Sequence, residues 1–214
     1  MVHPMGNGID FFRDQLPDLF ARGVALLRAR AAGGDERAAA KLADIMGARG
    51  LGWLTLEGAG EVWLSVADGE MRHIDARTPG EPVRFALRVP GEAVDVALAA
   101  LAGAVDLGSE KAALRAAGTA SARLERAVGE AGLDFHLILQ ETPDFDEVLI
   151  EIALNREALP DKPTFTATVR WDDLAAMRAS GMNLQQLFLS GKLRLGGDYS
   201  RAMQVGMQLM QPPR

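Results

Sequence analysis

Apolar residues recur at helical spacing at the start of the chain. They follow the three-to-four-residue period of one helix face at Ile9, Phe12, Leu16, Leu19, Phe20, Leu26 and Leu27. Pro17 marks a kink or a fresh first turn. Gly33-Gly34 interrupts the pattern, and Asp35-Glu36 places negative charge where the dipole of a second helix, ending near Gly50, favours it. The sequence therefore predicts two amphipathic helices before any strand.

Four short apolar runs follow and predict strands. Two of them flank Gly58-Ala59-Gly60, which is typical of a β-hairpin. A third, from Met71 to Arg77, comes after the turn dipeptide Asp68-Gly69, and a fourth, from Val83 to Val89, alternates apolar and polar residues. A meander is the simplest arrangement of these four strands.

Helix-forming sequence closes the first half, and strands begin again in the second. An alanine-rich helix is expected over 93–102, and Ser109 begins a longer one that runs to about Ala131. Further strands are expected over 133–141, 148–154 and 164–169. Asp172 is expected to cap a short helix that reaches Met177 and is stopped by Gly181.

The two halves align weakly with each other. A shift of about 80 residues pairs Phe85 with Phe165, Val89 with Val169, and Glu92 with Asp172, and a shift one residue shorter pairs Leu114, Arg115, Gly118 and Ser121 with Leu193, Arg194, Gly197 and Ser200. These matches indicate two diverged copies of one α+β unit, and chance similarity of alanine- and leucine-rich sequence is the alternative. We predict units over 1–131 and 132–214, packed as one pseudo-dimeric body.

The segment from Met182 to Asp198 is the most distinctive in the chain. Asn183 and Gln186 resemble a capping box, Gly191 is expected to end the short helix that follows, and Lys192-Leu193-Arg194-Leu195 alternates as an edge strand. Asp198 is then expected to cap the final helix. The succession Leu-Phe-x-x-Gly-Lys-Leu-x-Leu-x-Gly-Asp, followed by an amphipathic helix, resembles the end of the sterol carrier protein type 2, or nonspecific lipid-transfer, family.

The resemblance is most specific over residues 165–210, and the aromatic-leucine-proline pattern of 11–20 resembles the family's leading helix. It implies an α+β fold with a small mixed or antiparallel sheet of about five strands covered by helices, here duplicated. It also implies a hydrophobic tunnel for a fatty acid, acyl-CoA, sterol or other polycyclic lipid, and no catalytic residues. The first half departs from the pattern because it lacks the Gly-Lys and Gly-Asp pairs, so a supporting role is expected for it.

The resemblance places the tunnel among apolar residues of the second half. The ligand-binding residues expected on this basis are Phe165, Leu174, Met177, Met182, Leu187, Phe188, Met203, Met207 and Met210. Methionine is unbranched and adapts to ligands of different shape, although it also fills ordinary cores. The residues alone favour an ordinary core, and the resemblance favours a tunnel.

Composition excludes several other classes. The net charge of -6 and a pI near 5.1 oppose nucleic-acid binding, and the absence of cysteine excludes disulfides and thiolate metal sites. His3, His73 and His136 lie far apart in the sequence, so neither a metal site nor a cofactor is expected. Residues 1–8 lack the features of a secretory signal, and no stretch is long and apolar enough to span a bilayer, so we expect a cytoplasmic protein.

The sequence therefore predicts a non-catalytic carrier whose partner is an apolar small molecule. A different class is an accessory or assembly protein for lipid-pathway enzymes, with the same fold and a filled core. An internal cavity favours the carrier, and an exposed apolar patch without a cavity favours the accessory protein. A transient membrane contact and a homodimer are left open by the sequence.

Overall fold

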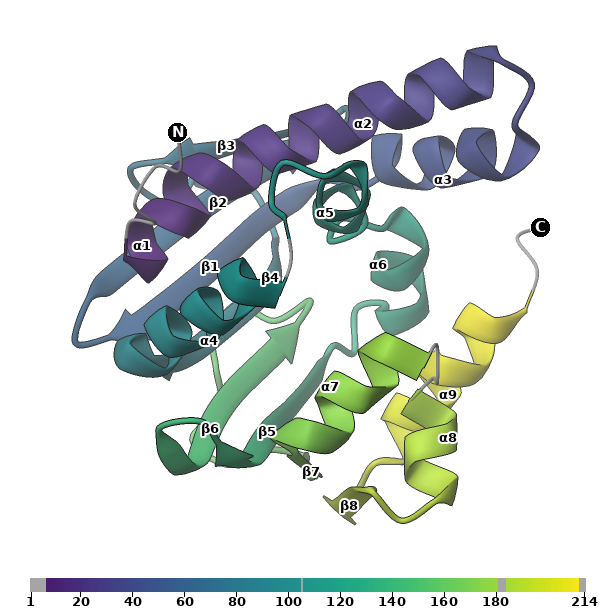
Figure 1. Cartoon of the computed structure of the whole chain (residues 1–214). Helices are drawn as coiled ribbons and strands as arrows, with labels where there is room; N and C mark the ends of the chain where they lie inside the picture. Colours follow the sequence, from purple (N-terminus) through teal and green to yellow (C-terminus); the bar gives the residue numbers. More distant parts are fainter. Residues whose placement is uncertain (1–6, 105, 181–183, 212–214) are drawn as a thin grey trace.

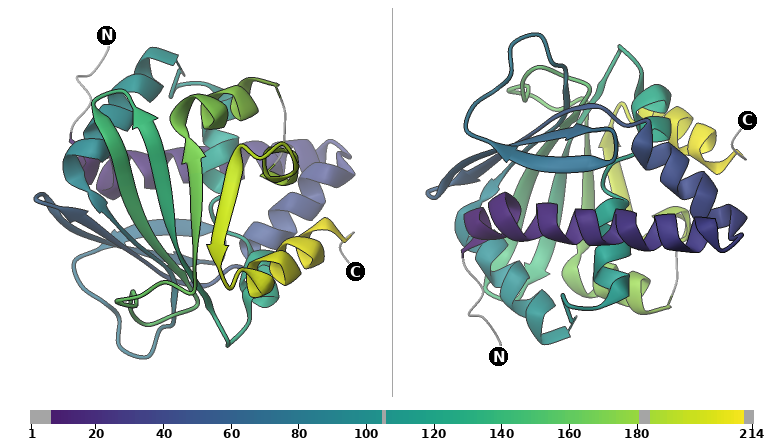
Figure 2. Two further views of the ribbon diagram at one scale, coloured as in Figure 1. Left: turned by 90° about the horizontal axis from the view of Figure 1, so that it is seen from below. Right: turned by 90° about the horizontal axis from the view of Figure 1, so that it is seen from above.

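The computed structural model describes residues 7–104, 106–180 and 184–211. Its strands form one mixed sheet, and the helices gather on one face of it (Figures 1 and 2). The described strands are β1 (Gly50–Glu57), β2 (Gly60–Ala67), β3 (Glu70–Ile74), β4 (Val83–Pro90), β5 (Leu133–Thr142), β6 (Phe145–Leu154), β7 (Phe165–Arg170) and β8 (Leu193–Gly197). Their order across the sheet is β3-β2-β1-β4-β6-β5-β7-β8.

The chain begins with the two predicted helices. A continuous helical run comprises α1 (Gly8–Asp10), the π-helical segment η1 (Phe11–Gln15) and α2 (Leu16–Ala32), and α3 (Glu36–Met46) follows it. Pro17 lies in the first turn of α2, directly after the π-helical segment, and the helical run continues through it. The side chain of Asp35 accepts hydrogen bonds from the N–H groups of Arg37 and Ala38 and thereby caps α3.

The first three strands form the predicted meander, but β4 does not continue it. Instead, β4 pairs in parallel with β1. The strand β1 buries several apolar side chains and takes a central position, whereas β3 is short and exposes Glu70 and Arg72, as suits an edge strand. The prediction of a four-stranded meander is therefore wrong in its last strand.

The second half repeats the antiparallel hairpin and the parallel strand pair of the first half. The strands β5 and β6 form an antiparallel hairpin, β7 pairs in parallel with β5, and β8 pairs antiparallel with β7 at the edge of the sheet, as predicted. Because β4 also pairs with β6, one sheet continues across the predicted boundary between residues 131 and 132. The predicted α+β class with a helix-covered mixed sheet is confirmed, and the sheet has eight strands rather than about five.

The helix predicted from Ser109 to about Ala131 is two helices. They are α5 (Glu110–Ala117) and α6 (Ala122–Val128). The hydroxyl of Ser109 caps α5, and the hydroxyl of Ser121 accepts a hydrogen bond from the N–H of Leu124 and caps α6. The linker between the helices, 118–121, contributes to a cavity wall described below.

The remaining helices are α4 (Gly91–Ala104), α7 (Trp171–Ser180), α8 (Leu184–Leu189) and α9 (Ser200–Met210). Asp172 lies inside the first turn of α7, so its predicted capping position is wrong. Gly191, with φ of 73°, follows the end of α8 as expected. The Asp198 side chain accepts the N–H of Ser200, the first residue of α9, but the N-cap position is Tyr199, so the predicted capping position is one residue too early. The predicted capping box begins at Asn183, which lies outside the described residues.

The two internal alignments differ in how they fit these elements. Glu92 and Asp172 both lie in the first turn of a helix that follows a parallel strand, α4 and α7 respectively. At the shift of 79 residues, Leu114 lies in α5 whereas Leu193 lies in β8. That alignment therefore pairs a helix with a strand.

Candidate ligand-binding site

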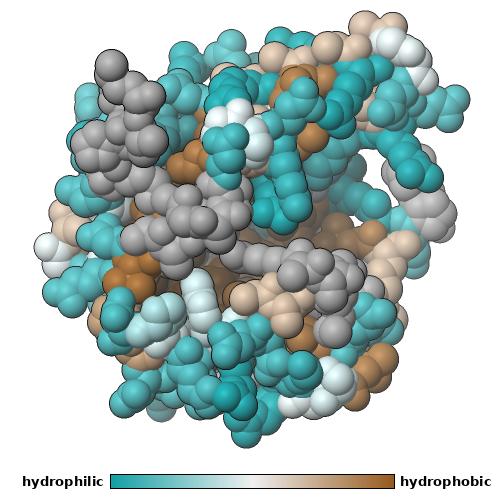
Figure 3. Space-filling model, in the orientation of Figure 1, coloured by the Kyte–Doolittle hydropathy of each residue, from teal (hydrophilic) through white to brown (hydrophobic). Residues whose placement is uncertain are grey.

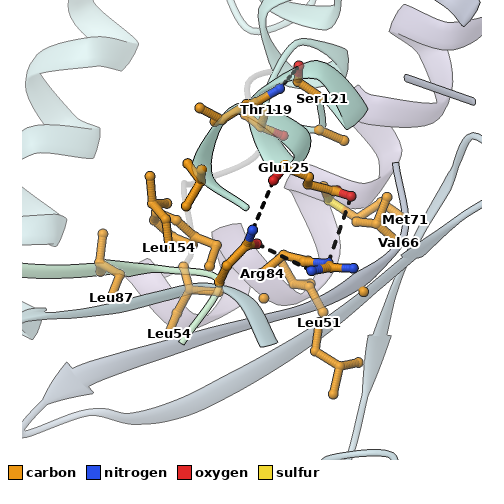
Figure 4. A pocket seen from close by; sticks show the side chains of 18 of the residues that line it. Leu51, Leu54, Val66, Met71, Arg84, Leu87, Thr119, Ser121, Glu125 and Leu154 are labelled. Carbon is orange, nitrogen blue, oxygen red and sulfur yellow. Dashed lines mark hydrogen bonds and ion pairs between the residues drawn. The ribbon is translucent and has the colours of Figure 1, made fainter. Parts of the chain in front are cut away.

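An apolar cavity of about 350 Å³ lies between the sheet and the helices. It is lined by β1 to β4, the segment around η1, the 118–121 linker and α6 (Figure 4). The apolar side chains in its wall are Phe12, Leu16, Leu51, Leu54, Leu64, Val66, Met71, Phe85, Leu87, Ala120, Leu124, Val128 and Leu154. Its size falls in the range of about 300–1,000 Å³ that small-molecule sites occupy. Figure 3 shows the molecule from the same side as Figure 1, with a hollow near the middle and hydrophobic residues at its floor.

A hydrogen-bonded polar cluster forms part of the cavity wall. It consists of Arg84 on β4 and Glu125 on α6, both labelled in Figure 4, and Asn155 just after β6. Arg84 Nε lies 3.8 Å from Glu125 Oε2, and Arg84 Nη1 donates to Asn155 Oδ1 at 3.5 Å. Asn155 Nδ2 donates to the backbone carbonyl of Glu125 at 3.0 Å. Three segments distant in sequence therefore place polar groups beside an otherwise apolar space.

A β-bulge directs Arg84 into this cavity. Leu51 pairs with Val83 and Gly52 pairs with Phe85, so Arg84 is the extra residue of β4 in the ladder with β1. In a regular strand Arg84 and Phe85 would face opposite sides of the sheet, yet both line the cavity. The bulge therefore adds a cationic side chain to a wall that alternation would have left apolar.

The second unusual backbone position in the cluster is Asn155. Its φ is 51°, in the left-handed region that non-glycine residues rarely adopt and that asparagine tolerates better than most. In this conformation its amide Nδ2 donates to the carbonyls of Glu125 and Gly129, each at 3.0 Å. Its backbone N–H donates to the carbonyl of Arg84 at 3.0 Å, so one residue ties α6 to the bulge.

Burial changes the acidity of the cluster. It raises the pKa of Glu125 above the usual value for a glutamate, because the charged carboxylate loses hydration. The N–H of Arg49 and the guanidinium of Arg84 oppose this rise in pKa, and the negative charge of Asp44 adds to it. The Glu125 side chain is 20% exposed and that of Arg84 is 37% exposed, so the pair is only partly hydrated.

Helix α6 is fixed at both ends, which holds the cavity wall in place. At its start, the carboxylate of Asp44 on α3 accepts hydrogen bonds from Ser121 Oγ and the N–H of Arg123, both at 2.7 Å. At its end, Arg201 on α9 donates to the carbonyl of Val128 at 2.6 Å. The wall therefore depends on helices from both halves of the chain.

A second apolar cavity of about 260 Å³ adjoins the first. It lies between the halves, because its wall includes α4 and β4 from the first half and β5, β6 and Trp171 from the second. Phe12, in the π-helical segment, and Leu87, on β4, line both cavities. These two side chains therefore stand between the two spaces.

The ligand-binding residues predicted from the sequence lie elsewhere. None of the described ones is among the residues that line the two cavities. Phe165 is buried and stacks on Phe135 with ring centroids 4.9 Å apart. Leu174 packs on the core beside the second cavity, and Leu187 is buried.

The other predicted ligand-binding residues that the structure describes are half-buried or exposed. Met177 and Phe188 are half-buried, and Met182 lies outside the described residues. Met203, Met207 and Met210 are 44%, 57% and 63% exposed, so they are not enclosed in a tunnel. Their spacing of four and three residues puts them on one face of α9, and we call them the methionine stripe. A role of these nine residues in ligand binding stays a prediction.

The sequence carries one signal for the observed cavity. Gly118 and Ser121 are residues that often end and begin helices, and they lie inside the segment predicted as a single helix. The bulge at Arg84 and the conformation of Asn155 depend on strand pairing between distant segments, so sequence periodicity does not reveal them. The first half, for which a supporting role is expected, supplies most of the first cavity's wall.

The fold and the cavity define a class: an α+β protein with an apolar cavity between a mixed sheet and its helices. Residues 110–210 match the SCP-2 sterol transfer family, which confirms the resemblance over that segment. The matched segment contributes α6 and the end of β6 to the first cavity. The match indicates lipid binding or transfer. No curated protein matches the chain.

Within the described residues, no group of three or more His, Cys, Asp or Glu side chains is arranged to hold a metal ion. Among the helices described, none combines the length and apolarity needed to cross a membrane.

Proposed function

We propose that this protein binds an apolar small molecule between its sheet and its helices and catalyses no reaction on it. The ligand would be a fatty acid, acyl-CoA, sterol or other polycyclic lipid. The observation that carries this proposal is the cavity of about 350 Å³ with its largely apolar wall. Burial of apolar surface contributes about 25 cal/mol per Å², so such a wall favours an apolar ligand without extensive polar recognition.

The proposed ligand would lie mainly in the first cavity and could extend toward the second. Phe12 and Leu87 line both spaces, so a rotation of the Phe12 side chain would connect them. Phe12 belongs to the π-helical segment, a type of structure that often occurs at functional sites. A longer ligand would therefore require this side chain to move.

We also propose that 1–131 and 132–214 are diverged copies that share one sheet. In each half a hairpin is flanked by a strand parallel to its first strand, as β2-β1-β4 and as β6-β5-β7. This recurrence supports duplication. Under this proposal the first copy takes part in binding.

The test combines lipid analysis with a blocked cavity. Protein purified from its expression host is denatured and extracted, and the extract is expected to contain a stoichiometric lipid by mass spectrometry. Leu124→Trp adds bulk to the cavity wall and is expected to weaken binding of a fluorescent polyene lipid at least tenfold, because filled space cannot accept the ligand. Leu189→Trp, at a position that is 74% exposed, is the matched control and should bind normally.

Two results would count against a carrier. One is the bare polypeptide mass in native mass spectrometry together with no binding of any polyene lipid. The other is equal binding by Leu124→Trp and the wild type, which would place the ligand outside the cavity.

The alternative is an accessory or assembly protein for lipid-pathway enzymes. The methionine stripe favours it, because large apolar side chains exposed together are typical of interaction surfaces. This alternative predicts that serine substitutions in the stripe abolish stimulation of a partner enzyme, whereas Leu124→Trp leaves it unchanged. The carrier proposal predicts that Leu124→Trp weakens equilibrium lipid binding, whereas serine substitutions in the stripe leave it unchanged.

A further inference from the structure

The polar cluster offers hydrogen bonds to a ligand but little unbalanced charge. Arg84 Nε donates to the carbonyl of Arg49 at 3.1 Å, and Nη1 donates to Asn155. Within the described part of the chain, Nη2 of Arg84 donates no protein hydrogen bond. From the described residues, the carboxylate of Glu125 accepts only long hydrogen bonds, of 3.3 and 3.4 Å, from the N–H of Arg49. One donor and one acceptor are therefore available side by side.

The charge of Arg84 is already balanced. Its guanidinium lies 3.8 Å from Glu125, and Asp44 is close enough to raise the pKa of Glu125 further. A ligand carboxylate placed here would add a third negative charge beside those of Glu125 and Asp44 in a partly dehydrated wall, which is unfavourable. A hydroxyl group adds no charge. It can donate to Glu125 and accept from Arg84 Nη2.

The cluster is held in position by backbone features that an ordinary core does not need. The bulge turns Arg84 toward the cavity, and Asn155 adopts a rare backbone conformation while its amide secures α6. Irregular backbone of both kinds is concentrated at functional sites in proteins. The Asn155 amide also accepts from Arg84, so it fixes the guanidinium against Glu125.

We propose that Arg84, Glu125 and Asn155 form a head-group site that selects uncharged apolar molecules bearing a hydroxyl over carboxylates of the same chain length. The hydroxyl binds between Glu125 and Arg84, and the apolar body of the ligand lies against Leu54, Leu64 and Leu124. This inference rests on the proposed function, because it requires the cavity to hold a ligand.

The test compares two probes that differ only in the head group. Fluorescence titration gives the dissociation constants of a polyene fatty alcohol and of the polyene fatty acid of the same length, at neutral pH and fixed ionic strength. The wild type is expected to bind the alcohol about tenfold or more tightly, the size of effect associated with a hydrogen bond to a charged group. Glu125→Gln removes the negative charge and is expected to strengthen binding of the acid. The ratio of the dissociation constants for the acid and the alcohol should therefore fall about tenfold.

Controls separate local from general effects. Glu130→Gln removes the same charge from an exposed position two residues after the end of α6 and should leave the preference unchanged. If Glu125→Gln does not fold, Asn155→Gly serves instead, because glycine accepts the φ of 51° while the amide is lost. That variant is also expected to lose the preference for the alcohol.

The outcomes are distinct. Equal affinity of the wild type for both probes, or tighter binding of the acid, overturns the head-group site while leaving the cavity proposal intact. An unchanged preference in both Glu125→Gln and Asn155→Gly also overturns it. Failure of the wild type to bind either probe contradicts ligand binding in the cavity itself, and with it this inference.

Discussion

Two glycines in the middle of helices should respond to the same substitution with opposite signs. Gly23 lies in α2 where that helix crosses α5, and Gly206 lies in α9. A Cβ atom on Gly23 would lie 2.1 Å from the carbonyl oxygen of Ala113 and 2.7 Å from Cβ of Ala117, whereas a Cβ on Gly206 would meet nothing within 4 Å. Replacement of each glycine by alanine is therefore a matched pair.

The magnitudes follow from these distances. Alanine is favoured over glycine by about 0.8–1.0 kcal/mol inside a helix, so Gly206→Ala should raise the free energy of unfolding by about that amount. Gly23→Ala gains the same helix propensity but forces α2 and α5 apart, because backbone atoms cannot yield as a flexible side chain can. Overpacking costs about 1–3 kcal/mol, and so tight a contact belongs at the upper end, which leaves a net loss of about 1–2 kcal/mol.

Urea denaturation followed by circular dichroism measures both effects. In thermal melts, 1 kcal/mol corresponds to about 2–4 °C for a chain of this size, so Gly206→Ala should melt higher and Gly23→Ala lower than the wild type. Since α5 leads into the 118–121 linker of the cavity wall, lipid binding by Gly23→Ala should also weaken. A Gly23→Ala protein as stable as Gly206→Ala would refute the close approach of α2 and α5.

Four more predictions concern the core, the cavity and the surface. Phe12→Ala should connect the two cavities and increase affinity for long-chain lipids more than for short ones in fluorescence titration, and an unchanged length dependence would argue against Phe12 as the partition. Asp134 is 3% exposed and accepts hydrogen bonds from the N–H and hydroxyl of Thr164, so Asp134→Ala should lower the free energy of unfolding by about 1–3 kcal/mol in urea titrations; a loss below 0.5 kcal/mol would contradict this. Because the pKa of Glu125 is raised in the folded state, the fold binds that proton more tightly than the unfolded chain does, and ionisation of Glu125 lowers stability as pH rises from the unfolded pKa through the folded pKa. Glu125→Gln should therefore gain stability relative to the wild type as pH rises above about 4, the usual range of a glutamate pKa, and a gain that grows as pH falls would show this sign to be wrong. Serine at all three positions of the methionine stripe should slow lipid transfer between vesicles while leaving the equilibrium affinity for lipid unchanged. A weaker equilibrium affinity would instead indicate that the stripe belongs to the binding site, as the sequence predicted.

The periodicity of the sequence determined most of the secondary structure. The helical spacing before Gly33, the alternation over 83–89 and the turn residues at Gly58-Ala59-Gly60 each correspond to an observed element. Local chemistry was enough there, because backbone preferences and a single buried face act over a few residues. The motif ending in Asp198 likewise identified the family that matches residues 110–210.

The position of the cavity was decided by tertiary structure. The pairing of β4 with β1 and β6 brings Arg84 beside Asn155, and α6 then covers them with Glu125. These contacts join residues 30 to 71 positions apart, and no repeating pattern of hydrophobicity specifies them. Methionines with the spacing of a helix face could be buried or exposed, and only packing determined that the stripe on α9 faces outward. Sequence therefore fixes which segments are helices and strands, whereas the space left between them depends on how those segments pack.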